Sequence, residues 1–517
     1  MNRLFVIYIY DRNELSLLHL LKISISERFI IITMGISILI IITIYFGALL
    51  LISYFVSRKN SDNEAFFLGN RQSPWFVVAI AMVGTSISGV TFVSVPGMVG
   101  KFDMTYMQMV FGFTVGYFVI AYVLLPLYYR LNLTTIYGYL EQRFGFFSYK
   151  TGASFFILSK IIGAAARLYL VAMILQTLVF DQWNIPFIVT VTGIILLIWA
   201  YTFRSGIKTI IWTDTLQTSS LILGVILIIW QVASKMDMDV PQMVSSITSN
   251  EHSRIFVFDD WTSKQYFFKQ FLSGIFITIV MTGLDQDMMQ KNLTCKSLKD
   301  AQKNMITYGF AFTPINLLFL SLGVLLLLFA SQYNIILPEN SDQILPVLAT
   351  EYLGFPVLVF FTIGIIAAAF SSADSALTGL TTSVCVDLLN IKGEDAMKAK
   401  KTRQKVHLFV SLAFLFVILI ISYIHQDNIL DTIYKVASYT YGPLLGLFFF
   451  GLFTKVNIRD RYVPYICILA PVISYFAEFI LLKQFSYQVG YEILLFNGLL
   501  TVIGLFCLSQ REPKTSL

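Results

Sequence analysis

Charged side chains are scarce in this 517-residue sequence. Only 13% of its residues are Asp, Glu, Lys or Arg, whereas 57% are hydrophobic, and the mean hydropathy is +0.75. A domain folded in water carries about 25% charged residues, so this composition excludes an ordinary water-soluble fold and indicates a membrane protein.

Cysteine and histidine are also scarce, with four residues of each. Cys295, Cys385, Cys467 and Cys507 form no CxxC pair, and the histidines lack metal-ligand spacing. Neither a disulfide framework nor a zinc site is therefore indicated. Polar segments long enough to form a soluble domain are also missing: the longest polar stretches are those near residues 235–265 and 390–405. We expect no appended catalytic domain, and the few histidines make an enzyme embedded in the bundle a poor alternative.

Apolar runs of about 20 residues recur along the whole chain, and each is long enough to cross a hydrocarbon layer of roughly 30 Å. Their unbroken character predicts helices rather than barrel strands. We predict thirteen spans, at residues 33–57, 74–100, 104–129, 151–180, 184–203, 209–234, 266–289, 305–331, 355–388, 406–424, 429–453, 462–482 and 488–509.

Basic residues fall mainly in alternate connections between these spans. We count 23 on one side, Lys291 among them, and six on the other. The positive-inside rule then places the C-terminus in the cytoplasm of a cell-membrane protein. The net charge of +6 reports this topology and gives no sign of nucleic-acid binding.

The first 33 residues mix charges with short apolar pieces and lack the features of a signal peptide. We expect either that Met34 is the true start, with a mis-assigned extension before it, or that residues 1–33 form an amphipathic arm.

The stretch "AAAFSSADSALTGLTTS", from Ala367 to Ser383, places a carboxylate and many hydroxyls inside an apolar run. At helical spacing the hydroxyls form one stripe flanked by Asp374. Small hydroxyl residues can simply pack between membrane helices. A carboxylate within a span, however, usually faces a wet path or a cation, and oxygen ligands suit a hard cation.

A second unusual stretch, "AMVGTSISGVTFVSVPGMVG", runs from Ala81 to Gly100 with hydroxyls among its glycines and a proline. It predicts either a broken helix of the kind that binds ions and substrates in transporters or a kinked helix with a small-residue packing face.

Arg167 lies in the middle of a predicted span, where its side chain cannot easily reach the membrane surface, so we expect it to face a cavity. A guanidinium binds carboxylates through two parallel hydrogen bonds, which predicts an anionic solute. The alternative is that Arg167 pairs with Asp374 or Asp214. Lys160 lies closer to the inner edge, and we expect it to snorkel. Phe111, Phe113 and Tyr117 are expected to line the cavity.

Six segments of the sequence, listed below in chain order, resemble those of the sodium:solute symporter family, which includes sodium/glucose, sodium/proline and sodium/sialic-acid transporters. The resemblance spans residues 34–510, and Lys291 stands where the family usually has arginine. The segments are "AFFLGNRQSPW", "LTTIYGYLEQRFG", "IIWTDTLQT", "TGLDQDMMQKNLTCKSLKDAQKN", "AAAFSSADSALTG" and "SYTYGPLLGLFFFGLFTK".

The resemblance implies an all-α polytopic membrane protein of about 13 transmembrane helices with a LeuT-like inverted repeat of five plus five helices. Each repeat would start with an interrupted helix, the first at residues 84–97 and the second near Ser273-Gly274. The implied divisions are the extension 1–33, an extra helix 34–57, the repeats 74–234 and 266–453, two C-terminal helices in 462–509, and a cytoplasmic tail 510–517.

The resemblance also implies site residues. The main sodium site would use the carbonyls of Gly84, Ile87 and Ala368 with the hydroxyls of Ser371 and Ser372. A second cation site would use Asp214, Asp374 and Ser375, although the family usually has serine at the position of Asp374. The solute would contact Ser86, Ser88, Thr91 and Arg167.

We therefore expect a secondary active transporter that couples sodium to uptake of a carboxylate-bearing solute, such as a sugar acid, sialic acid or a monocarboxylate, and that functions as a monomer in the lipid bilayer. The alternatives are sodium-coupled uptake of a neutral sugar, amino acid or vitamin, and proton-coupled symport on the same fold. A channel is a more distant alternative.

Overall fold

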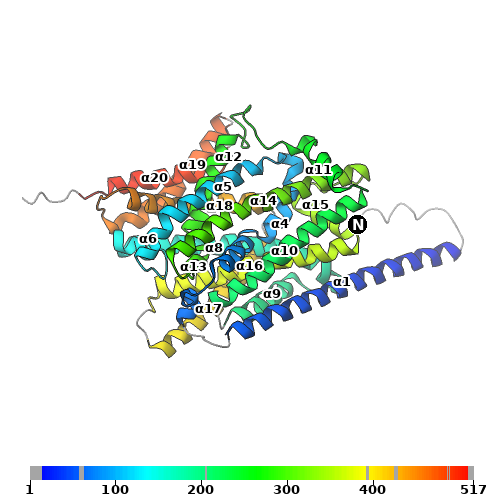
Figure 1. The fold of residues 1–517 in the computed structure, drawn as a ribbon, viewed down its shortest axis with the longest axis horizontal. Helices are drawn as coiled ribbons and strands as arrows, with labels where there is room; N and C mark the ends of the chain where they lie inside the picture. The colour runs from blue at the N-terminus through cyan, green and yellow to red at the C-terminus, as the bar shows by residue number, and fades with distance from the viewer. Residues whose placement is uncertain are drawn as a thin grey trace, which may run out of the picture.

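The computed structural model describes residues 14–57, 63–203, 206–391, 395–423, 429–485, 487 and 489–510. Within these ranges the chain forms helices and no β-strand. Most of them run roughly parallel or antiparallel in an elongated bundle, with α1 (Glu14–Ser57) extending past one end of it (Figure 1).

Among the described residues, nine helices are long and apolar enough to cross a membrane, or eleven if two bent helix pairs each count as one span. The chain is therefore a multi-pass membrane protein. The longer helices around the centre are α8 (Phe146–Leu175), α10 (Ile207–Lys235), α14 (Leu298–Gln332), α16 (Phe355–Ser383) and α18 (Ile429–Phe453). The others that cover them are α5 (Tyr106–Val119), α9 (Phe187–Thr202), α17 (Ala396–Tyr423), α19 (Val463–Phe485) and α20 (Ile493–Cys507).

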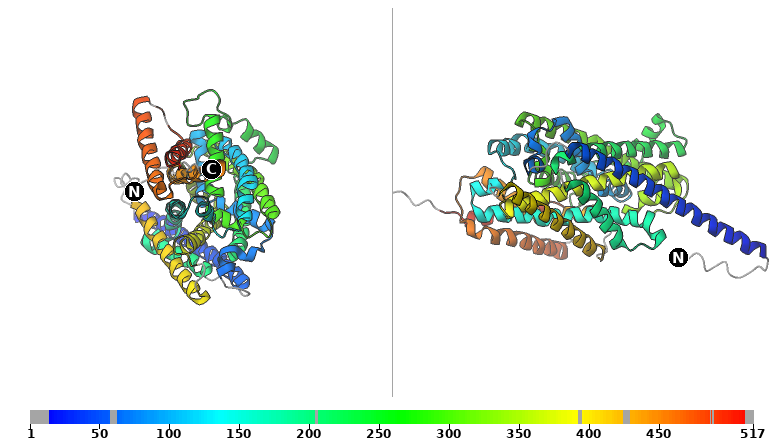
Figure 2. Two further views of the ribbon diagram at one scale, coloured as in Figure 1. Left: turned by 90° about the vertical axis from the view of Figure 1, so that its left-hand side faces the viewer. Right: turned by 90° about the horizontal axis from the view of Figure 1, so that it is seen from below.

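Among the described helices that could cross a membrane, the one that contains α16 is the most buried. It packs against α3, α4, α8, α10 and α13, and every residue from Ala367 to Ser383 is buried. Its serines and threonines therefore do not face lipid. Figure 2 shows the same bundle from two further directions, one of them nearly along the helices.

The first bent pair lies where the glycine-rich stretch predicts a break. Helix α3 (Trp75–Ser86) and α4 (Gly89–Phe102) meet at an angle of 58°. Ile87 and Ser88 have non-helical dihedrals between them. Pro96 lies inside α4, so the break is at Ile87 and Ser88 and not at the proline.

The second bent pair corrects the predicted interruption near Ser273-Gly274. Helix α12 (Phe267–Thr278) passes through these residues and continues as a π-helical turn to Gly283, and the 70° bend comes only before α13 (Gln286–Asn292). Asp285 caps α13, because its carboxylate accepts hydrogen bonds from the backbone N–H groups of Asp287 and Met288. The charged sequence at the end of the apolar run, and not the earlier glycine, marks the break.

Gly274 has a different role, in helix packing. A side-chain carbon at this position would overlap the backbone carbonyl of Met109 and lie 3.2 Å from the Cα of Gly112, both on α5. The two glycines therefore allow the backbones of α5 and α12 to approach closely, as small residues do between membrane helices.

The N-terminal extension is helical from Glu14 and continuous with the first predicted span. Residues 1–13 of the extension, and residues 511–517 of the predicted tail, lie outside the described part of the chain. Most of the other long helices lie close to the predicted spans, but α14 begins at Leu298, ahead of the predicted residue 305, and α17 begins at Ala396, ahead of the predicted residue 406.

This packing predicts the effect of enlarging Gly274. Gly274→Val should lower the thermal midpoint of the detergent-purified protein, because overpacking a tight contact costs about 1–3 kcal/mol. Gly193→Val on α9 is the matched control, since Gly193 is exposed and has no atom within 4 Å of an added side-chain carbon. Equal midpoints for the two variants, measured by fluorescence-detected size exclusion after heating, would contradict the close α5–α12 contact.

Candidate functional site

The break between α3 and α4 faces the hydroxyl stripe of α16. Ser372 Oγ donates a hydrogen bond of 3.3 Å to the Thr85 carbonyl on α3 and one of 3.0 Å to the Ala368 carbonyl on its own helix. Ser371 is fully buried on α16. A carbon added at Gly84 would lie 3.4 Å from the Ser371 hydroxyl oxygen. The structure therefore brings Gly84, Ser371 and Ser372 together.

The two remaining residues of the predicted main sodium site, Ile87 and Ala368, are fully buried. Ile87 ends α3 at the break, and Ala368 lies one helical turn before Ser372. Backbone carbonyls at a helix break lack their usual partners. The Thr85 carbonyl of α3 and the Ser372 hydroxyl of α16 meet at this buried place.

A cavity lies beside this place. Ser86, Arg167, Thr85 and Ser372 contribute to its wall. Ser86 Oγ lies 2.5 Å from the Tyr308 hydroxyl. Ser372 therefore belongs both to the hydroxyl stripe beside the break and to the wall of the cavity.

Not every predicted solute contact lines this cavity. Ser88 and Thr91 are buried on the far side of the bend and do not contribute to its wall. Phe113 and Tyr117 line it as expected. Phe111 does not, because its ring stacks on Phe256 with a centroid distance of 6.1 Å.

Arg167, on α8, reaches the cavity and is only partly buried. No ion pair joins it to an acidic side chain within the described part of the chain. Asp214 pairs with Lys291 instead, and Asp374 accepts a 2.8 Å hydrogen bond from the Tyr201 hydroxyl. The alternative in which Arg167 pairs with Asp214 or Asp374 is therefore wrong for this structure.

The sequence position of Lys160 predicts that it snorkels to the membrane surface, but its side chain stays inside the bundle. Its side chain is 8% exposed, and its Nζ lies 2.6 Å from an oxygen of Asp287 and 3.2 Å from Asp285. The Tyr441 hydroxyl donates a 2.6 Å hydrogen bond to Asp285. The ammonium is held inside the bundle because α13 places two carboxylates opposite it. All four residues line the cavity.

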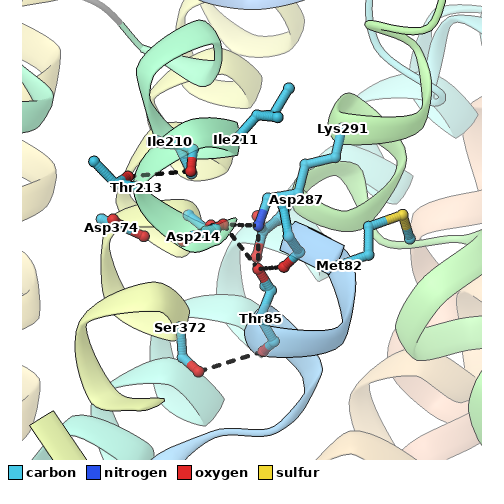
Figure 3. A network of polar contacts seen from close by, with 12 residues as sticks. Met82, Thr85, Ile210, Ile211, Thr213, Asp214, Asp287, Lys291, Ser372 and Asp374 are labelled. Carbon is cyan, nitrogen blue, oxygen red and sulfur yellow. Dashed lines mark hydrogen bonds and ion pairs between the residues drawn. The ribbon is translucent and has the colours of Figure 1, made fainter. Parts of the chain in front are cut away.

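Lys291, assigned from the sequence to an inner connection, is fully buried on α13. Its Nζ lies 2.5 Å from Asp214 Oδ2 on α10, and neither side chain is exposed to solvent. The ammonium also donates to the Thr85 hydroxyl. Figure 3 shows Lys291, Asp214 and Thr85 joined by these contacts, with Ser372 joined to Thr85 below them.

The three residues of the predicted second cation site divide into two groups. Ser375 Oγ donates a 3.3 Å hydrogen bond to Asp214 Oδ2, so these two share a contact. One oxygen of Asp374 is bonded to Tyr201 on α9, and the other has no hydrogen-bond partner among the described residues.

Sequence reasoning missed the roles of Lys160, Asp285, Asp287 and Lys291. A signal was present, because "GLDQDMMQKN" places three charges directly after an apolar run. Only the 70° bend after Gly283 turns these charges into the bundle instead of into the inner connection.

Curated relatives are similar to this chain over most of their length. The sodium/sialic acid symporter NanT of Aliivibrio fischeri is 25% identical over 80% of this chain and 82% of its own. The sodium/sialic acid symporter SiaT of Proteus mirabilis is 25% identical over 80% of this chain and 83% of its own length. The sodium-coupled monocarboxylate transporter 2 of Danio rerio is 24% identical over 78% and 65%.

Solved structures share the fold. A Na+-coupled sialic acid symporter in a substrate-bound outward-open state superimposes with a TM-score of 0.77 at 21% identity, covering 92% of this chain and 97% of the other. A nucleobase-cation-symport-1 family transporter in a closed conformation gives a TM-score of 0.56 at 14% identity, and the match covers 86% of this chain and 93% of the transporter. A sequence profile described as "Sodium:solute symporter family" matches residues 66–459, more than half of the chain, and the protein belongs to that family.

Proposed function

We propose that this protein is a secondary active transporter that couples sodium to the uptake of a small carboxylate-bearing organic solute. Membership of the sodium:solute symporter family supports the sodium coupling. The observation that carries the proposal is that the Arg167 guanidinium forms no ion pair with any residue that the structure describes and lines a cavity whose wall includes Ser372, beside the break between α3 and α4.

The charges in the cavity wall favour an anionic solute. Two cationic side chains line the cavity, Lys160 and Arg167. Lys160 is matched by the carboxylates of Asp285 and Asp287, so the charge of Arg167 is the one left for a solute. A carboxylate would form two charge-assisted hydrogen bonds with it.

We propose a sugar acid such as sialic acid, or a monocarboxylate, as the solute, in agreement with the names of the relatives. Ser86 would bind a polar group of the solute in the cavity. Ser88 and Thr91 would become solute contacts only if α4 moves during transport, because both are buried behind the bend.

We propose that sodium binds the carbonyls of Gly84, Ile87 and Ala368 and the hydroxyls of Ser371 and Ser372. The closeness of the buried Ser371 hydroxyl to Gly84 supports this assignment. Such an ion would connect the broken helix to α16. Because Ser372 also contacts the cavity, solute and ion would each bind better with the other present, which is what coupling requires.

The architecture supports thirteen spans, since the two shorter apolar helices α9 and α20 would bring the total to that number. The two broken helices, α3–α4 and α12–α13, would each start a repeat of five helices, at residues 74–234 and 266–453. Residues 34–57 would add one helix before the repeats and 462–509 two after them. We further propose a monomer in the cell membrane with a cytoplasmic C-terminus, for which the basic inner connections are the support.

Arg167→Gln tests the anionic solute. In proteoliposomes with an inward sodium gradient, this variant should raise the half-saturating concentration of labelled sialic acid roughly 10- to 100-fold, because hydrogen bonds to a charged group are worth about 1.5–3 kcal/mol. Arg167→Lys should raise the half-saturating concentration less, since lysine keeps the positive charge but cannot form the two parallel hydrogen bonds of a guanidinium. Arg130→Gln, at an exposed position, is the control.

The same assay tests the solute class by competition with lactate, glucose and proline. Carboxylates without an amino group should compete, and glucose should not. Competition by glucose with none by carboxylates would contradict the anionic assignment and favour the neutral-solute alternative.

Ser371→Ala tests the main sodium site. Loss of one polar ligand costs about 1 kcal/mol, so the sodium concentration for half-maximal uptake should rise about fivefold. Ser219→Ala should leave it unchanged, because Ser219 is exposed and bonds to a carbonyl of its own helix. Replacing sodium with choline at fixed pH should abolish uptake, whereas full uptake in choline would support proton coupling instead.

A further inference from the structure

We propose that the cavity has a second polar end at Asp287, which binds a hydrogen-bond donor of the solute at a distance from the solute's carboxylate. The inference rests on the proposed binding of that carboxylate by Arg167, and it narrows the class of solute. The solute is then an elongated acid that carries hydroxyl or amino groups, and not a short or purely alkyl monocarboxylate.

The carboxylates of Asp285 and Asp287 have different surroundings. Asp285 is fully used within the protein, since it caps α13 and accepts hydrogen bonds from Lys160 and from the Tyr441 hydroxyl. Asp287 is 1% exposed, and its Oδ2 lies 2.6 Å from Lys160 Nζ. Its Oδ1 is buried and has no hydrogen-bond partner among the described residues. Asp287 lines the cavity, so a solute can supply the missing donor.

Charge also favours a donor at the second polar end. Within the described part of the chain, the ion pairs of Asp285 and Asp287 are with Lys160, so two carboxylates face one ammonium. A buried carboxylate oxygen without a partner is costly, because it has left water and gained no donor in exchange. A hydroxyl or an amino group of the solute would supply that donor, whereas an alkyl chain would not.

Helix α8 sets the spacing between the two ends of the cavity. Lys160 and Arg167 both line the cavity and lie seven residues apart on this helix. Seven residues make almost two turns, so the two side chains share one face of α8 and lie roughly 10 Å apart along it. Lactate is too short to contact both ends, whereas a six-carbon acid with a hydrogen bond of about 2.9 Å at each end can reach them.

The wall between the two ends leaves room for such a solute. Gly163 and Ala164 lie between Lys160 and Arg167 on α8, and both line the cavity. A side-chain carbon added at Gly163 would have no atom within 4 Å. Small residues therefore stand where the middle of an extended solute would lie.

Three six-carbon acids test the second polar end on the full-length protein, purified in detergent with sodium. Gluconate carries hydroxyls, 6-aminohexanoate carries an amine, and hexanoate carries neither. The half-stabilising concentration of each acid is measured by fluorescence-detected size exclusion after heating. At least one of the two donor-bearing acids should need a concentration roughly tenfold or more below that of hexanoate, because a hydrogen bond to a charged group changes affinity by such a factor. Tighter binding of gluconate assigns the donor as a hydroxyl, and tighter binding of 6-aminohexanoate assigns it as an amine.

Variants locate the preference at the second polar end. Asp287→Asn should reduce it several-fold and leave hexanoate unchanged, because a neutral amide binds a donor more weakly than a carboxylate does. Lys160 keeps Asp285 as its partner in this variant, so no buried ammonium is left alone. Asp237→Asn, at an exposed position, should keep the full preference. Arg167→Gln should weaken all three acids alike.

Gly163→Leu is a second variant that leaves every ion pair intact. Its side chain would fill the open space between the two ends, so it should weaken binding of the donor-bearing acid without lowering the thermal midpoint of the free protein. If Asp287→Asn does not fold, undiminished binding of that acid by Gly163→Leu overturns the proposal.

Two further results would overturn the second polar end and leave the Arg167 assignment intact. One is hexanoate binding to the wild type as tightly as both donor-bearing acids, and the other is an unchanged preference in a folded Asp287→Asn protein. Stabilisation of the wild type by none of the three acids would instead refute the carboxylate-bearing solute, and this inference with it.

Discussion

Polar groups at the centre of the bundle must find partners without water, and the rest of the structure depends on this constraint. Each broken helix frees backbone carbonyls and N–H groups at a depth where an unsatisfied group costs several kcal/mol. At the first break a hydroxyl of α16 donates a hydrogen bond to a freed carbonyl, and at the second break an aspartate side chain caps the backbone N–H groups of α13. The oxygen atoms that make the breaks tolerable are also the atoms that can replace the water around an ion.

Short helix α13 carries much of this arrangement. Its seven residues, with Asp285 as the cap, present two carboxylates to Lys160 on α8 and one ammonium to Asp214 on α10. Removing one partner of a buried pair costs about 3–5 kcal/mol, because the other charge is left alone. Any movement of α13 during transport must therefore carry both sets of contacts along or exchange them together.

The cavity and the proposed ion site share Ser372. Its hydrogen-bond partner Thr85 also lines the cavity, so an ion that orders Ser372 would also shape the cavity. Lys160 is matched by acidic partners, whereas Arg167 is not. This difference between two cations on the same helix is the basis of the proposed preference for an anionic solute.

The sequence by itself determined the class, the spans and the first break, because these follow from local hydropathy and from glycine and serine in consecutive positions. It also pointed to Arg167 and to the α16 hydroxyls, since isolated polar groups stand out in an apolar run. Only the tertiary structure decided the partners of Asp214, Asp374, Lys160 and Lys291, and placed the second break after Gly283. An ion pair depends on which residues the fold brings within about 3 Å, and helices distant in sequence meet at places that no local pattern records.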